Sequence, residues 1–172
     1  EFPVVFVSDL GKQFNKMDIR NAVVFHQKWG CGMDMTDIGK RVMYRTLAKR
    51  AIAEAIELEN LSEETRVLYV ALTRAKEKLI LTGSVKDVAK AFRKWEGAAY
   101  SQQETLPVFQ LRRGLCYLDW IMPAFLRHPK AYHAAFSEMR DMLFAEEQSE
   151  WSLRYLPKEK ILLGLSEEQK KA

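Results

Sequence analysis

Arg74 lies at the end of an apolar helical face, where its guanidinium can bind an anion. It lies in the segment 63–83, which reads EETRVLYVALTRAKEKLILTG and predicts an amphipathic helix that runs into a buried strand. At helical spacing Arg74 shares a face with Val67 and Val70. A cation at the end of an apolar stripe is costly unless an anion meets it. The simplest such anion is Glu77, in a surface pair worth about 0.2–0.5 kcal/mol.

Two basic segments have a structural and a binding interpretation. The segment 92–95, Phe-Arg-Lys-Trp, is either a basic-aromatic patch that stacks on single-stranded bases or an amphipathic helix that buries Phe92 and Trp95. We favour burial. Arg112 and Arg113 stand at the expected start of a helix, where the dipole disfavours cations. Their partner is either a phosphate or an acidic neighbour, and the sequence leaves both open.

The histidines and cysteines do not form a metal-binding pattern. His128 and His133 are separated by Pro129, and neither is close in sequence to His26. We therefore expect partly exposed helix-end histidines and no metal site. The 2 cysteines lack CxxC spacing, which argues against a disulfide framework or a structural zinc and favours a reducing, cytoplasmic location.

The composition is that of an ordinary globular protein with a small excess of positive charge. The 172 residues include 27 Lys and Arg against 23 Asp and Glu, for a formal net charge of +4. This balance is compatible with a nucleic acid partner without demanding one. No apolar run is long enough to span a bilayer, and the opening lacks a signal-peptide pattern, so no membrane partner is expected.

The first hundred residues alternate between strand and helix patterns. Short β-branched runs bounded by Gly, Ser and Asp predict strands buried on both faces, as in a parallel sheet. Thr46 predicts a helix cap, and Ser62, followed by two glutamates, predicts the cap of a separate helix. The expected order is strand 3–7, strand 22–25, an irregular connection over 29–45, helices from 47 and from 62, strand 79–82 and helix 85–95. This order predicts an α/β domain.

The pattern changes after Gly97. A polar loop is followed by helical spacing of apolar residues from Leu111 to Phe125, in which Trp120 is expected to anchor a helical extension to the preceding domain. Further predictions are a helix from Pro129 to Leu143, a strand at 151–155 and a capped helix from 166. The expected organisation is a domain over 1–96, a linker over 97–110 and a helical extension over 111–172.

Two segments resemble helicase motifs. The segment 63–83 resembles motif VI of the UvrD-type superfamily 1 helicases, and the opening EFPVVFV resembles the second half of their motif V. Two such motifs in the family's order form a far more specific signal than either alone. FVSDLGKQFN and LCYLDWIMPAFLRHP narrow the resemblance to the AddA/RexA helicase-nuclease subunits of bacterial AddAB (RexAB) enzymes. The chain looks like a fragment of such a protein.

The resemblance implies a partial RecA-like (P-loop NTPase-type) parallel sheet with flanking helices and a C-terminal helical extension. In the family, two motor domains hold ATP between them, and the motif VI arginine contacts the γ-phosphate. By position that arginine is Arg74, expected at the mouth of the sheet's carboxyl edge, and Glu1 matches the motif V glutamate of the nucleotide site. In this fragment we favour the explanation of Glu1 as a terminal residue without a role. Thr73 either orients the arginine or bonds back to its helix, and Tyr69 is equally compatible with core packing.

Further expectations concern activity and partners. The chain has no GxxxxGK[ST] loop, so the isolated chain should neither hydrolyse ATP efficiently nor cut DNA. The parent is expected to be a helicase and exonuclease in double-strand break repair. Its expected cofactors are ATP and Mg²⁺. Its expected partners are DNA with a single-stranded tail or a duplex end, a subunit of the AddB/RexB type and the remaining domains of the same chain. The alternatives are a UvrD or PcrA-type helicase without a nuclease and a non-catalytic docking module.

Overall fold

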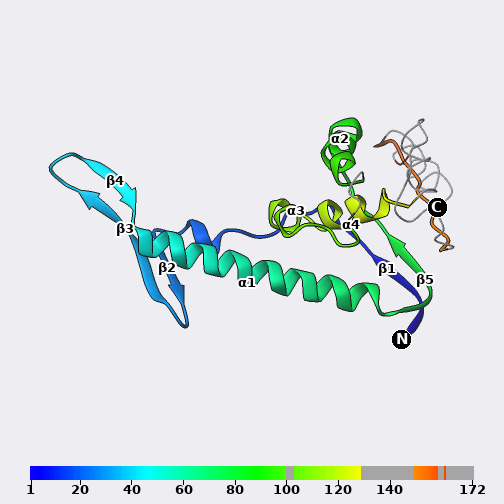
Figure 1. Ribbon diagram of the computed structural model, residues 1–172, viewed down its shortest axis with the longest axis horizontal. Coiled ribbons are helices and arrows are strands. Elements are labelled where there is room, and N and C mark those ends of the chain that lie inside the picture. The colour runs from blue at the N-terminus through cyan, green and yellow to red at the C-terminus, as the bar shows by residue number, and fades with distance from the viewer. Residues whose placement is uncertain (100–102, 129–148, 159–160, 162–172) are drawn as a thin grey trace, which may run out of the picture.

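The computed structural model describes residues 1–99, 103–128, 149–158 and 161. Helix α1 (Leu47–Leu72) runs along most of the elongated molecule, with a small β-sheet at each end (Figure 1). One sheet is a parallel pair, and the other is antiparallel with three strands. Within the described part of the chain, no helix combines the length and apolarity needed to cross a membrane.

The parallel pair consists of β1 (Phe2–Val7) and β5 (Ala75–Leu81). Its register places Val5 opposite Leu79 and Val7 opposite Leu81. Parallel neighbours need a long crossover, and here the crossover contains α1 and the antiparallel sheet. The prediction of an α/β fold with a parallel sheet is confirmed, as are the strands predicted at 3–7 and 79–82, although β5 begins earlier. The predicted burial of these strands on both faces is wrong: Val4 and Phe6 are exposed, and neither strand contains a buried residue.

Helix α1 begins at the predicted cap. The Thr46 Oγ1 atom accepts a hydrogen bond from the Lys49 backbone N–H at 3.2 Å. The helix then continues for 26 residues, about 39 Å at the usual rise. The prediction of a separate helix capped by Ser62 is wrong. No Gly or Pro interrupts the span, and Leu, Ala and Glu around Ser62 are strong helix formers that outweigh one cap-type residue.

The antiparallel sheet lies at the start of α1 and contains β2 (Val23–His26), β3 (Gly30–Asp37) and β4 (Val42–Arg45). The first half of β3 pairs with β2 and the second half with β4. The strand predicted at 22–25 is therefore confirmed one residue later. The irregular connection predicted for 29–45 is wrong, because Gly30 and Gly32 lie within β3 and most of the segment forms two strands. A Cβ on Gly32 would lie 2.5 Å from the Lys49 Cα, so the close contact of β3 with α1 requires glycine.

Three further helices lie beside the parallel pair: α2 (Val88–Ala99), α3 (Val108–Arg113) and α4 (Leu118–Phe125). The helix predicted at 85–95 corresponds to α2. The single helix predicted over 111–125 is two helices, interrupted at Gly114. A Cβ there would lie 2.4 Å from the Trp120 Nε1 atom, so this turn is shaped by the tight approach of the indole.

The apolar core lies between α2 and α4. Its buried members are Phe92, Trp95, Met122, Phe125 and Leu126. The strand predicted at 151–155 is wrong: this segment has no regular structure, although its side chains pack on the core. Trp151 contacts Phe125 and Tyr155 contacts Phe92, with ring centroids 4.8 Å and 5.7 Å apart. The helices predicted from 129 to 143 and from 166 lie outside the described residues.

Candidate functional site

Arg74 lies in the short turn between α1 and β5. The Thr73 N–H donates to the Tyr69 carbonyl at 3.0 Å, and the Thr73 hydroxyl donates to the same carbonyl at 2.9 Å. Of the two roles considered for Thr73, bonding back to the helix is the one observed. These bonds fix the backbone from which the Arg74 side chain projects. The side chain is exposed, and among the described residues it forms no ion pair, so the surface pair with Glu77 is absent.

The structure brings Glu1 next to Arg74. The Phe2 N–H donates to the Arg74 carbonyl oxygen at 2.9 Å, and Phe2 is paired with Ala75 in the sheet. Both Glu1 and Arg74 have exposed side chains. The two residues predicted from separate motifs therefore lie side by side, with nothing in the described part of the chain covering them.

Glu1 and Arg74 lie at the opposite edge of the parallel sheet from the one predicted. Glu1 and Arg74 precede β1 and β5, so they lie at the amino edge, and the predicted position at the carboxyl edge is wrong. The carboxyl edge is covered: Leu10 is 1% exposed, its N–H bonds to Thr82, and its carbonyl accepts from Leu118 at the start of α4. The rule that ligands bind at the carboxyl edge concerns the domain that holds the ligand. A side chain that reaches a ligand held by another domain need not obey it.

Large apolar side chains near this pair are exposed. Phe2 is 59% exposed, and Tyr69 is 67% exposed, so the core-packing interpretation of Tyr69 is wrong. Val67 and Val70, in the last turns of α1, are also exposed. We call these four residues the apolar rim. Exposed apolar side chains gathered in one region mark interaction surfaces.

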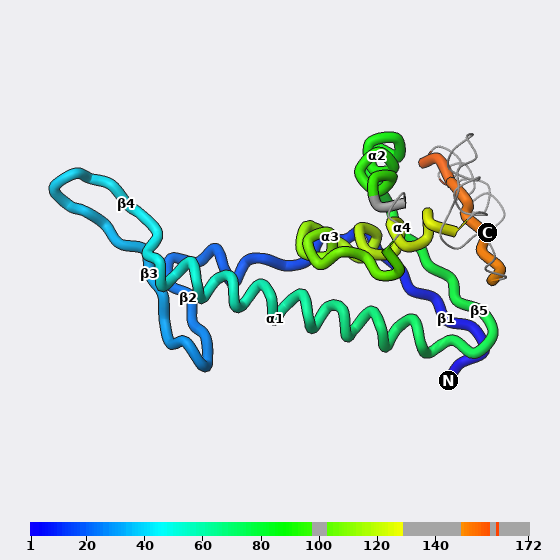
Figure 2. Tube along the Cα trace, in the orientation of Figure 1, coloured from blue at the N-terminus to red at the C-terminus, as the bar shows by residue number. Residues whose placement is uncertain are grey.

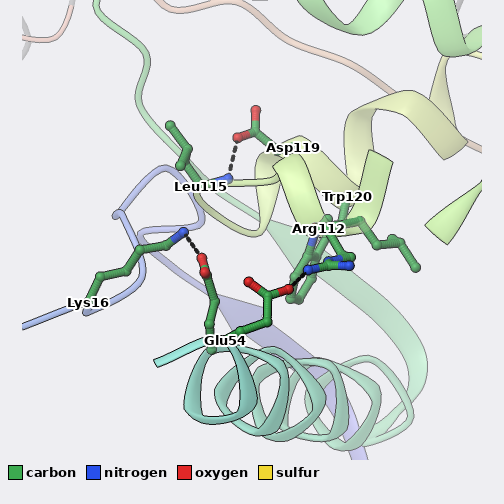
Figure 3. A network of polar contacts seen from close by, with 8 residues as sticks. Lys16, Glu54, Arg112, Leu115, Asp119 and Trp120 are labelled. Atoms are coloured by element: carbon green, nitrogen blue, oxygen red, sulfur yellow. Dashed lines mark hydrogen bonds and ion pairs between the residues drawn. The ribbon is translucent and has the colours of Figure 1, made fainter. Parts of the chain in front are cut away.

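Ion pairs join the middle of α1 to the segment after β1 and to α3 (Figure 3). Arg112 of α3 pairs with Glu54, and Lys16, from the segment after β1, pairs with Glu57. Arg112 and Arg113 lie in the last turn of α3, where the dipole favours cations, so their predicted place at a helix start is wrong. Of the two partners considered for this pair, the acidic neighbour is the one observed for Arg112.

Tyr117 adds a second contact between α1 and the segment before α4. Its hydroxyl donates a hydrogen bond to the Glu64 carboxylate. Burial, together with this hydrogen bond, raises the pKa of Tyr117 to about 12. The phenol therefore stays a donor across the neutral range.

Asp119 is the polar centre of the α2–α4 contact. Its carboxylate accepts hydrogen bonds from Lys94 Nζ at 2.7 Å, Trp95 Nε1 at 2.9 Å and the Leu115 N–H at 2.8 Å. Burial alone would raise the pKa of Asp119, but these hydrogen bonds outweigh it and lower the pKa. Sequence reasoning missed this residue; the only signal was an acidic side chain inside the apolar run YLDWIM.

Two aromatic predictions are confirmed in the same region. Phe92 and Trp95 are buried, which favours the amphipathic helix over a stacking surface for bases. Trp120 is the predicted anchor: its Nε1 donates to the Leu111 carbonyl at 2.8 Å, and its ring lies 4.8 Å from that of Phe14, which follows β1.

The side chains of the two described histidines are buried, against expectation. His128 is 5% exposed, and the side chain of His26 is 4% exposed, with its Nε2 3.2 Å from a Glu59 oxygen. Over the described ranges, no three His, Cys, Asp or Glu side chains form a group that could hold a metal ion. Cys31 and Cys116 are free thiols, and burial raises the pKa of Cys116.

A parallel pair of strands with flanking helices is consistent with the C-terminal domain of a helicase. Residues 1–86 match the UvrD-like helicase C-terminal domain. The chain belongs to this family. It is 49% identical to the ATP-dependent helicase/nuclease A subunit of Clostridium novyi over 74% of its length, and 42% identical to that of Acetivibrio thermocellus over 98%. The chain spans 10% and 14% of these two relatives.

Proposed function

We propose that the chain is the C-terminal part of the second motor domain of an ATP-dependent helicase/nuclease of the AddA/RexA type, in which Arg74 contacts the γ-phosphate of ATP held by the other motor domain. The observation that carries the proposal is the exposed Arg74 side chain beside Glu1. The Phe2 N–H holds the two residues next to each other by donating a hydrogen bond to the Arg74 carbonyl oxygen. The names of the relatives support both activities of the parent.

The chemistry suits an arginine. Phosphoryl transfer spreads negative charge over the γ-phosphate oxygens, and a planar guanidinium meets two oxygens at once. An arginine supplied in this way typically accelerates hydrolysis by about 10³-fold or more. The hydrogen bonds at Thr73 hold the turn before the phosphate arrives, which reduces the entropy lost when the contact forms.

Because the arginine and the phosphates belong to different domains, ATP favours closure of the two domains and hydrolysis releases it. The apolar rim gives the other motor domain a surface on which to close. Repeated closure and opening moves the parent along DNA. We assign the parent to double-strand break repair in the cytoplasm, acting on a single-stranded tail or a duplex end with a partner of the AddB/RexB type.

Mg²⁺ does not fit the described residues, because they present no acidic cluster of ligand type. We assign its ligands, with the phosphate-binding loop, to the first motor domain. Arg74 and Glu1 are therefore the contribution of this chain to the nucleotide site.

Duplex unwinding by the full-length parent tests this function. The full-length protein should separate a tailed duplex with ATP and not with a non-hydrolysable analogue. The isolated 172-residue chain should show no DNA-stimulated ATP hydrolysis above a buffer blank. Failure of the full-length protein to unwind DNA, or clear hydrolysis by the isolated chain, would contradict the proposal.

A further inference from the structure

A basic groove lies at the start of α1, outside the nucleotide site. It has a volume of about 390 Å³ and lies between the segment 16–20, the end of β4 and the first turns of α1. Its charged lining consists of Lys16, Arg20, Arg45, Lys49, Arg50, Glu54 and Glu57. The volume falls within the range of about 300–1,000 Å³ typical of ligand pockets, enough for a nucleotide unit.

The acidic residues of this lining are already engaged. Glu57 pairs with Lys16, and Glu54 pairs with Arg112 of α3. The buried Lys49 forms an ion pair at 2.5 Å with Asp34, which does not line the groove. The cations that remain are three exposed arginines, which we call the groove arginines: Arg20, Arg45 and Arg50. Within the described residues, none of the three forms an ion pair.

The placement of these cations is unfavourable without an anion. Arg50 lies in the first turn of α1, Arg45 just precedes the helix, and the first turn contains no acidic residue. The amino end of a helix carries partial positive charge, which repels cations and attracts anions. A bound phosphate would be stabilised by the helix end and by guanidinium groups together.

We propose that the groove arginines bind the phosphate backbone of the DNA strand on which the parent acts; this proposal rests on the function proposed above. The ligand is not the ATP that Arg74 contacts. The groove lies at the start of α1, and Figure 2 shows this start, beside β3, and the β1–β5 pair at opposite ends of the helix. The helix is about 39 Å long at the usual rise, too far for one nucleotide to reach both.

The neighbouring surface restricts the path of the strand. The charged lining of an adjoining cavity of about 160 Å³ consists of one lysine and four acidic residues: Lys16, Asp18, Glu57, Glu63 and Glu64. Carboxylates repel a phosphate backbone, which disfavours a path of the strand along α1 toward its middle. It crosses α1 at the first turns instead, and contacts few phosphates there.

Salt-dependent DNA binding by the full-length protein tests the groove. The variant is Arg45→Gln/Arg50→Gln, and binding is measured without ATP to a single-stranded oligonucleotide and to a blunt duplex. Each lost phosphate contact should lower the slope of log affinity against log salt by about 0.7 for the single strand and about 0.9 for the duplex. Binding should weaken equally for unrelated DNA sequences.

Two control variants sharpen the test. Lys40→Gln/Arg66→Gln removes two positive charges outside the groove, one in the β3–β4 turn and one on the exposed surface of α1. It should leave the slope unchanged. Arg45→Lys/Arg50→Lys keeps both positive charges and should retain most of the slope. This variant tests the groove even if the glutamine variant folds poorly.

The outcomes separate the two proposals. A slope that stays at the wild-type value in the glutamine variant, or falls equally in the charge-matched control, overturns the groove while leaving the proposed function intact. A lowered melting temperature with an unchanged slope also overturns it, because the arginines would then serve a contact within the protein. A wild-type protein that binds neither DNA overturns the proposed function and the groove together.

Discussion

The carboxylate of Asp119 shows how one buried charge can hold two helices and a turn together. Its side chain is 7% exposed, and its three donors come from α2 and from the segment before α4. A buried carboxylate is stable only when such donors satisfy it. Asp119 therefore links α2 to α4 and to the segment before α4.

Replacing Asp119 should destabilise the chain. Asp119→Ala removes three hydrogen bonds to a charged group and leaves the buried Trp95 Nε1 without its acceptor. We expect a loss of about 2–3 kcal/mol in the free energy of unfolding. Urea denaturation of the 172-residue chain measures it. Asp37→Ala, where the side chain is 40% exposed, is the control, and an equal effect of both would contradict the account.

The pH dependence of stability follows from the same group. The folded state lowers the pKa of Asp119, so its contribution to stability is present above the unfolded pKa. That contribution is lost as the pH falls from about 4 through the folded pKa. Asp119→Asn cannot titrate, so its unfolding free energy should fall less steeply in acid than that of the wild type. Parallel pH profiles for the two proteins would refute the assignment.

Helix α1 joins the two ends of the molecule, and its continuity is an element-scale claim. Ser62 lies exposed in the middle of the helix, although its residue type and the following glutamates suit a cap. If α1 is continuous, Ser62→Ala should be neutral or stabilise by up to about 0.5 kcal/mol through helix propensity. If Ser62 were a cap, the same change would cost about 1 kcal/mol. Thermal unfolding distinguishes these signs.

Proline at the same position gives a stronger signal. Ser62→Pro should cost about 3 kcal/mol or more, because proline removes a hydrogen bond and clashes with the preceding turn. Far-ultraviolet circular dichroism should show a loss of helix content. A proline variant as stable as the wild type would contradict a continuous α1.

The attachment of the antiparallel sheet to α1 depends on one glycine. Gly32→Ala places a methyl group 2.5 Å from the Lys49 Cα, which the backbone cannot accommodate without moving. We expect a loss of about 1–3 kcal/mol from overpacking. At Gly39 a Cβ would meet only the Asp37 side chain, at 3.4 Å, so Gly39→Ala is the matched control. Equal stability of the two variants would refute the close contact.

The sequence pattern predicted the elements that depend on residues close together in the chain. The apolar runs of β1 and β5 and the cap at Thr46 were visible in sequence because β-branched runs and capping residues act through their neighbours in the chain. The strands β3 and β4 were not, because strand preference depends on packing, and Gly32 is required by α1 rather than by its own strand. Arg74 and Glu1 were predicted by motif, whereas their place at the amino edge follows from the parallel pairing of the two strands that begin directly after them.

At the scale of the whole molecule, α1 separates two proposed binding regions. The exposed Arg74 and Glu1 directly precede β5 and β1, and the groove arginines lie near the start of α1. Figure 2 shows these two regions at opposite ends of the helix. Between them, Glu54, Glu57 and Glu64 tie the helix to Arg112, Lys16 and Tyr117. A shift of α1 on domain closure would therefore move the groove and the helical extension together.

Single-turnover ATP hydrolysis by the full-length protein with Arg74→Ala, at saturating DNA, tests the central claim most directly. We expect the hydrolysis rate to fall by about 10³-fold, with the melting temperature unchanged. Arg74→Lys should restore little of that rate, because an ammonium group cannot meet two oxygens at once. Arg66→Gln, which removes another exposed guanidinium from the same region, should hydrolyse ATP normally. A rate for Arg74→Ala close to that of the wild type would contradict the claim.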